Sequence, residues 1–280
     1  MLAAAAIKIK ALNAALSKPF VATAEMLRWP GKVDVSDGAR FSAYFTRSRK
    51  DILRAQRLRF QVFSEAYGAS FDAPAGIDRD RFDKHCLHLV VVDNRSGELV
   101  GYTRVLPKHR VVRTGGFYSE SEFDLSMLTK LNGRIAEIGR TCIHADYRNG
   151  AVITVMWSCL AQYMVEARID YLIGCASVAF SEGYDVGAIV GRIRALHLSP
   201  EHLRAQPNLP LEALSTEDVA GKVAMPPLLK AYLRMGAKVC GEPCWDPEFN
   251  CLDFFILMAR DEMPKRYVQH FLQAQMPVAA

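Results

Sequence analysis

Hydrophobic and polar positions along the chain follow two periodicities, which predict strands alternating with helices. Residues 41–46 are predicted as a strand, and 51–66 as a helix, because apolar positions in the latter recur every three or four residues. Residues 88–92 and 99–106 are predicted as two strands joined by a turn of Asn, Ser and Gly. A sheet therefore begins near the start of this region.

The middle of the chain predicts a strand, a crossover helix and a second strand. Residues 134–143 form the first predicted strand, 151–167 a long and largely apolar helix, and 171–178 a buried strand. This order predicts two parallel strands in a right-handed unit. A short helix is predicted just before the unit, at 123–131.

The C-terminal part has a less regular pattern. Residues 186–198 are predicted as a helix, and 199–227, rich in Pro, Glu and Ser, as an irregular excursion. A helix then runs from Pro226 to Met235, followed by a strand at 251–258 and a last helix at 264–273. The fold class is α/β, with a mixed sheet, helices on both faces and a C-terminal extension.

Turn-rich residues between 29 and 38 divide the chain into two parts. Residues 1–40 are predicted as an N-terminal amphipathic helix and linker, and 41–280 as the main domain. Lys8 and Lys10 interrupt the Ala-rich start before a secretory signal of adequate length can form. The predicted helix either rests on a membrane interface or is a frayed or core-docked terminus.

Charge and cysteine usage narrow the class of protein. The formal net charge is +5, and the arginines are scattered, so nucleic acid is not an expected partner; a small acidic partner or an anionic membrane fits better. No run of about eighteen uncharged apolar residues predicts a membrane span. Seven cysteines, mostly in apolar runs, predict reduced buried thiols in a reducing compartment. No metal site is expected from their spacing.

A carboxylate and a strand-to-helix turn provide the candidate chemistry. Glu137 lies in an apolar strand with Arg140 three residues along, so it either forms a structural ion pair or faces a cleft and works there. Arg148, Asn149 and Gly150 then lead into the long helix, whose free N–H groups favour an anion such as a phosphodiester. Together they suggest a cofactor arm threading toward a base.

The same segment resembles a known superfamily. Residues 143–148 are similar to the strand-to-turn segment of the GNAT acyltransferases, in which a hydrophobic residue and usually a proline precede the Arg of the pyrophosphate-binding turn. Ala145 replaces the proline, and Ala151 and Ile153 stand where glycines are expected three and five positions after Arg148. The resemblance implies a GNAT-like twisted mixed sheet, and the missing glycines point away from coenzyme A.

Narrower resemblances extend over roughly residues 45–275. The acyl-homoserine-lactone synthases, a GNAT-like branch that takes acyl groups from acyl carrier protein, have four patterns in the same order and local spacing: Arg59 with Phe63, Asp80 with Asp83, Arg104 to Pro107, and Glu137 with Arg140. The tryptophan that these enzymes have after the helix phenylalanine is absent. Segments 137–148, 174–177 and 226–255 look still more like the ornithine N-acyltransferases of ornithine-lipid synthesis, often labelled haemolysin-like.

This resemblance implies an N-acyltransferase that moves a (3-hydroxy)fatty acyl chain from acyl carrier protein to the α-amine of L-ornithine, giving lyso-ornithine lipid. It implies acyl carrier protein and an amino acid as partners, acyl-acyl carrier protein as donor co-substrate, and no bound cofactor. A cytoplasmic location is expected, with peripheral contact at the inner face of the membrane. The rivals are another acceptor amine, a signal synthase, or a non-catalytic lipid-binding protein.

Site roles follow from this chemistry. An ammonium must lose a proton before it attacks a thioester, and Glu137 is the expected base. Arg104 and Arg140 either bind the acceptor carboxylate in fork geometry or lock the acidic groups in place. Backbone amides beside Thr141 and Cys142 are expected to stabilise the oxyanion where the parallel strands diverge.

The remaining candidates keep two readings each. Asp80 and Asp83 either receive a cationic side chain or pair within their own loop. Arg59, on the first helix with Phe63, is expected to be solvated or structural rather than catalytic. Ser177 lacks an activating partner in the sequence and is expected to be a strand residue near an acyl tunnel. Four cations are expected to steer an acidic carrier protein: Arg192, Arg194, Lys222 and Lys230.

Overall fold

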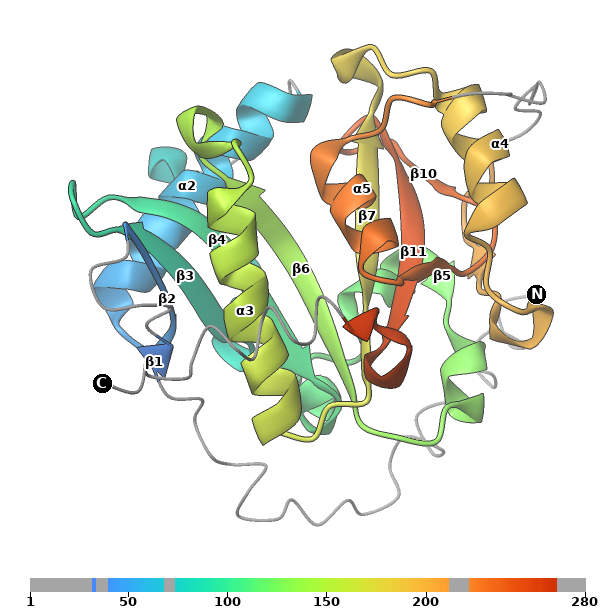
Figure 1. Ribbon diagram of the computed structural model, residues 1–280, viewed down its shortest axis with the longest axis horizontal. Helices are drawn as coiled ribbons and strands as arrows, with labels where there is room; N and C mark the ends of the chain where they lie inside the picture. Colours follow the sequence, from blue (N-terminus) through green and yellow to red (C-terminus); the bar gives the residue numbers. More distant parts are fainter. Residues whose placement is uncertain (1–31, 34–39, 68–73, 212–221, 266–280) are drawn as a thin grey trace.

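The computed structural model describes residues 32–33, 40–67, 74–211 and 222–265. Within these ranges one nine-stranded sheet has the order β1-β2-β3-β4-β6-β7-β11-β10, with β9 also paired to β11 (Figure 1). Its strands are β1 (Lys32–Val33), β2 (Phe41–Thr46), β3 (Leu87–Asp93), β4 (Leu99–Pro107), β6 (Ile135–Ile143), β7 (Tyr171–Ala179), β9 (Lys238–Val239), β10 (Cys244–Asp246) and β11 (Cys251–Ala259). Strands β5 (Phe123–Asp124) and β8 (Gln206–Pro207) form a separate pair.

Four helices accompany the sheet in the described part of the chain: α2 (Arg49–Tyr67), α3 (Ala151–Glu166), α4 (Val186–Leu196) and α5 (Pro227–Arg234). All strands and helices predicted between residues 41 and 258 are present within a few residues, except the helix at 123–131. The predicted N-terminal helix, and all but the first two residues of the predicted helix at 264–273, lie outside the described residues.

The helix predicted at 123–131 was wrong. Phe123–Asp124 pair with β8 as a short strand, and only Ser126–Lys130 form a 3-10 turn. The Asp124 carboxylate accepts a hydrogen bond from the Ser126 N–H at 2.8 Å, which favours a turn over a continuing helix. Packing also favours the short strand over a helix, because the Phe123 ring packs against Phe255 of the sheet with ring centroids 5.7 Å apart.

Helices cover both faces of the sheet, as predicted. Alternate strand residues point in opposite directions: Val91 and Val100 pack in one core with α3 and its buried Met156, whereas Val90 and Tyr102 pack in another with α2. Figure 1 shows α2 and α3 on opposite sides of β3 and β4. Helices α4 and α5 contribute to the same core as α3.

Strands β6 and β7 are parallel, as predicted, but they pair over only three positions before they diverge. The last pair is Glu137 with Ile173. Beyond it β6 stays with β4 and β7 stays with β11, so a V-shaped gap opens between them (Figure 1). A Cβ atom at Gly174 would lie 2.3 Å from the carbonyl oxygen of Ile138, so only glycine allows the strands to approach at the apex of the V.

All seven cysteines are free thiols, and six of them are buried, which confirms the prediction of reduced, buried cysteines. Burial raises the pKa of the thiols, for example that of Cys142 to about 12. None of the helices in the described ranges combines the length and apolar character that a membrane crossing requires.

Candidate active site

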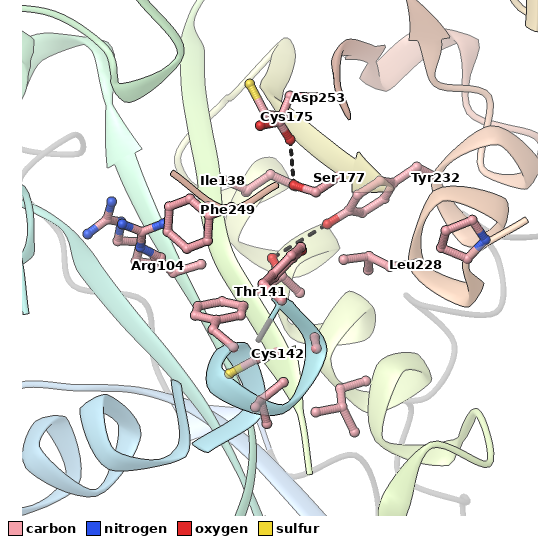
Figure 2. A pocket seen from close by; sticks show the side chains of 18 of the residues that line it. Arg104, Ile138, Thr141, Cys142, Cys175, Ser177, Leu228, Tyr232, Phe249 and Asp253 are labelled. Atoms are coloured by element: carbon pink, nitrogen blue, oxygen red, sulfur yellow. Dashed lines mark hydrogen bonds between the residues drawn. The ribbon is translucent and has the colours of Figure 1, made fainter. Parts of the chain in front are cut away.

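A cavity of about 370 Å³ fills the gap between β6 and β7 and extends to α2, α5 and β11 (Figure 2). Eight of the twelve site residues predicted from the sequence line it: Phe63, Arg104, Glu137, Arg140, Cys142, Arg148, Gly150 and Ser177. Four do not: Arg59, Asp80, Asp83 and Asn149. The divergence of the two parallel strands therefore gathers most of the predicted site in one place.

Two arginines and two aspartates beside this cavity form a buried ion-pair network. Arg104 Nη1 lies 2.6 Å from Asp80 Oδ1 and 2.7 Å from Asp83 Oδ1. Arg59 Nη1 lies 2.8 Å from Asp83 Oδ1. Burial alone would raise the pKa of Asp83, but the two arginines outweigh it and lower that pKa to about 2. The negative charges of these two aspartates are therefore balanced by arginines of the protein.

The structure excludes one of the two alternatives that the sequence left open for the aspartates and for Arg59. The aspartates do not pair within their own surface loop, because their partners come from α2 and β4. Nor is Arg59 solvated: its side chain is fully buried, and its Nε donates to Asp78 at 2.9 Å. The structural role expected for Arg59 is confirmed, since removing a buried partner would leave an unpaired charge.

Glu137 lies at the apex of the V with its carboxylate held by three hydrogen bonds. Oε2 accepts from the Tyr118 N–H at 2.8 Å, while Oε1 accepts from the Ser119 N–H at 2.8 Å and the Ser119 hydroxyl at 2.7 Å. Burial raises the pKa of Glu137, and these hydrogen bonds oppose that shift. A carboxylate can accept about four hydrogen bonds, so Oε2 keeps a free lone pair at the wall of the cavity.

Arg140 occupies a β-bulge on the cavity side of β6. Opposite the single residue Thr103 of β4, β6 has two residues, Arg140 and Thr141, and Arg140 adopts a left-handed φ of +52°. A hydrogen bond between the Thr103 and Thr141 hydroxyls, 2.8 Å apart, connects the bulge to β4. Its guanidinium stacks on three aromatic rings: Phe63 at 5.9 Å, Tyr118 at 5.1 Å and Phe249 at 5.2 Å from the ring centroid.

The charge of Arg140 is less well matched than that of Arg104. Its nearest carboxylate oxygens, on Asp78 and Asp80, are both 3.6 Å away, and its buried Nε donates no hydrogen bond. Arg104 instead makes two short contacts. The two arginines, equivalent in the sequence analysis, therefore differ: Arg104 makes two short ion pairs through Nη1, whereas Arg140 has carboxylate partners only at 3.6 Å.

The turn before α3 closes one end of the cavity. Gly150 has a φ of +95°, which glycine adopts readily, and it caps the helix without a side chain. Asn149 Oδ1 accepts from the Ala151 N–H at 3.1 Å, and Arg148 Nε donates to the Ile143 carbonyl at 3.3 Å. The amides of the next two residues have no intrahelical acceptor, so the positive end of the helix can bind an anion.

Sequence reasoning missed three polar residues that line the same cavity: Glu122, Asp253 and Tyr232. The Ser177 hydroxyl donates to Asp253 Oδ1, and the Tyr232 hydroxyl donates to Thr141 Oγ1 at 3.5 Å; Figure 2 draws both bonds. Asp253 carried a usable signal, because it is a carboxylate inside an apolar strand, as Glu137 is. Glu122 carried none, since no element was predicted for its segment.

Comparison with known proteins identifies the family and the fold. Residues 58–158 match the family described as Acetyltransferase (GNAT) domain. The L-ornithine N(alpha)-acyltransferase of Rhodobacter capsulatus is 34% identical over 243 residues, covering 80% of this chain and 92% of that protein. The protein of the same name from Brucella abortus is 31% identical over 243 residues, covering 80% of this chain and 86% of its own length.

A solved structure supports the fold alone. FeeM, an N-acyl amino acid synthase from uncultured soil microbes, aligns with a TM-score of 0.50 and 13% identity, covering 83% of this chain and 99% of that chain. The GNAT-like fold predicted from the sequence is confirmed by this alignment together with the family match.

Proposed function

The chain belongs to the L-ornithine N(alpha)-acyltransferase family, and from this premise we propose that it transfers a fatty acyl group from acyl carrier protein to the α-amine of L-ornithine. The observation that carries the proposal is the cavity between β6 and β7, which brings Glu137 and Arg140 together with the start of α3. A thioester donor, an amine acceptor and a base therefore fit in one enclosed space.

The donor is proposed to enter along the diverging strands. Its phosphodiester would lie at the start of α3, where free amides and the helix dipole favour an anion. The arm would then follow β6, which has no β7 partner beyond Glu137 and so offers unpaired backbone groups on that edge. Acyl carrier protein is preferred to coenzyme A because Ala151 and Ile153 replace the glycines that let a nucleotide-binding turn approach a pyrophosphate.

The acceptor is proposed to bind through Arg140. Its guanidinium lines the cavity, has carboxylate partners only at 3.6 Å and is held in place by three aromatic rings, so it can bind the α-carboxylate of an amino acid. Arg104, Arg59, Asp80 and Asp83 are proposed to act as a scaffold that fixes the cavity wall, since their charges satisfy one another.

Chemistry is proposed to proceed by direct attack. Glu137 removes a proton from the ammonium, directly or through water, and its raised pKa makes it a stronger base once ionised. The amine nitrogen then bonds to the thioester carbon, the oxyanion is stabilised by backbone amides near Thr141, and the C–S bond breaks. The departing thiolate takes up the second ammonium proton, so no covalent enzyme intermediate forms.

The product is amphiphilic, and we propose a cytoplasmic enzyme with peripheral membrane contact. Support comes from the turn Lys108–Arg113, in which Val112 is 75% exposed beside three basic side chains. Co-sedimentation with anionic vesicles should exceed that with neutral vesicles, and Val112→Ser should reduce it. Equal binding to both kinds of vesicle would contradict this placement.

A reconstituted assay tests the central proposal. Purified protein is incubated with L-ornithine and the same 3-hydroxyacyl group on acyl carrier protein or on coenzyme A, and products are identified by mass spectrometry. N-acylated ornithine, formed more efficiently from the carrier protein and less so at high salt, is the expected result. Failure to form it from either donor would refute the function, and better turnover with the coenzyme A thioester would refute the donor.

A further inference from the structure

A second group of acidic side chains lines the cavity away from the Arg59–Arg104 network. Glu122 follows the 3-10 turn Tyr118–Ser121, and Asp253 lies on β11. Glu122 is 7% exposed and Asp253 is 3% exposed, and both line the cavity. Strand pairing brings Asp253 opposite Ser177 of β7, so the acidic group sits on the β7 side of the V.

These carboxyl groups interact with each other and with neutral side chains instead of with cations. Glu122 Oε2 is buried without a hydrogen bond. Asp253 accepts from the Ser177 hydroxyl and, weakly, from the Cys251 thiol at 3.8 Å. Within the described residues neither carboxyl group forms an ion pair with a cationic side chain, in contrast to Asp80 and Asp83.

Electrostatics makes this arrangement receptive to a cation. Burial raises the pKa of Glu122 and of Asp253, and the charge of Asp253 raises that of Glu122 further. Two buried carboxyl groups that interact with each other cannot both ionise easily, so the state with one proton held between them is favoured. The pair then carries about one negative charge in a desolvated site, and a single ligand cation would neutralise it.

The opposite charge lies elsewhere in the same cavity. Tyr118 stacks under the Arg140 guanidinium, and the pKa of its phenol, raised mainly by burial, is also affected by the charges of Arg140, Glu122 and Asp253. A cationic group and an anionic group thus both lie near one aromatic residue of the cavity wall. A ligand with a carboxylate at one end and an ammonium at the other matches this order of charges.

We propose that the Glu122–Asp253 carboxyl pair binds the side-chain ammonium of the amino-acid acceptor and thereby selects a cationic acceptor over a neutral one. This inference rests on the proposed function, in which Arg140 takes the α-carboxylate. With both ends held, the α-amine is the nitrogen left to meet the thioester, and the side-chain nitrogen stays protonated and unreactive.

A metal ion is the competing occupant. Ligand atoms of Asp246, Cys251 and Asp253 lie within 4.8 Å of one another. Burial and the neighbouring carboxylates raise the pKa of the Cys251 thiol, however, which favours the protonated form, whereas metals bind the thiolate. An ammonium donates hydrogen bonds to carboxylates and needs no deprotonated thiol, so it fits this group better.

The test compares ornithine with norvaline, which has the same carbon chain without the terminal amine. For the unmodified enzyme, kcat/KM is expected to be about 100-fold higher with ornithine, the scale of a buried charged contact. Asp253→Asn and Glu122→Gln should remove most of this preference, because kcat/KM should fall much more for ornithine than for norvaline. Asp261→Asn, at a side chain 89% exposed, is the matched control and should retain it.

Calorimetric binding of both amino acids without donor gives the same comparison independently of turnover. Ornithine binding that requires Glu122 and Asp253, without any acyl transfer, would refute the proposed function and support this inference. Acylation of ornithine, with the preference for ornithine over norvaline unchanged in both variants, would support the proposed function and refute this inference. Equal use of norvaline by the unmodified enzyme, or stoichiometric zinc binding lost in Asp253→Asn, would overturn the inference even if the variants fold poorly.

Discussion

Replacement of Glu137 by Gln should reduce both turnover and stability, and the two losses can be separated. The amide keeps one oxygen, which can still accept from the Ser119 N–H and hydroxyl. Its NH₂ group then faces the Tyr118 N–H, which in the unmodified protein donates to Glu137 Oε2 at 2.8 Å. Two donors therefore oppose each other. One buried hydrogen bond to a charged group is lost.

The expected loss of stability is about 1.5–3 kcal/mol, the range for a hydrogen bond to a charged acceptor. The neutral amide partly offsets this loss because it avoids the desolvation that raises the pKa of Glu137. For turnover, loss of a positioned base predicts a decrease of about 10²- to 10⁴-fold. Urea unfolding gives the first quantity, and steady-state kinetics well below the unfolding transition gives the second.

Ser119→Ala is the matched control because it removes one of the three hydrogen bonds to Glu137, together with the weak bond from the Cys175 thiol at 3.3 Å, and keeps the carboxylate. The bond to Glu137 favours the ionised form, so its loss should raise the pKa of Glu137 and move the acid limb of the kcat/KM profile upward by about one pH unit. A Gln variant at position 137 with a near-normal rate across the pH range, despite its lower stability, would show that Glu137 only holds the Tyr118–Ser121 turn.

Further outcomes follow from the charged groups. Arg104→Lys should lower the melting temperature with near-normal kinetics in the folded fraction, whereas Arg140→Lys should raise the acceptor KM with little change in melting temperature; the reverse pattern would exchange their roles. Asp83, whose folded-state pKa is lowered to about 2, should contribute stability above pH 4 that is lost as the pH falls toward 2, measured by urea unfolding. Glu122 and Asp253 have raised folded-state pKa values, so their contribution should be lost as the pH rises above about 4; Glu122→Gln should flatten that decline, and an unchanged slope would contradict the pairing.

Local patterns were sufficient for the elements and for much of the site. The strand at 41–46 and the unit from β6 through α3 to β7 follow from periodicity, because each has a continuous buried face. Parallel pairing of β6 and β7 follows from the crossover helix, and β6 itself connects Glu137 to the turn before α3. These features depend on residues near one another in the chain.

Long-range pairing was not accessible from the sequence. Arg59 binds Asp83 from 24 residues away, and no local pattern distinguishes this buried pair from solvated charges. Glu122 and Asp253 meet only because β11 returns antiparallel to β7. The bulge at Arg140 is equally hidden, since its φ of +52° reflects a register shift between two strands rather than a favourable residue type.

The divergence of β6 from β7 also measures length. From Ile138 to Ile143 a regular strand would rise about 17 Å at 3.3 Å per residue, and the bulge at Arg140 shortens this distance. This stretch separates the apex of the V from the end of β6, where the turn into α3 begins. If the phosphate of the donor arm binds at that helix, the length of the strand sets how far from the phosphate the thioester must lie to reach the apex. Removing two residues from this stretch would bring the anchor about 7 Å nearer the apex. The number of residues in β6 therefore sets the distance between the phosphate site at the start of α3 and the reaction site at Glu137.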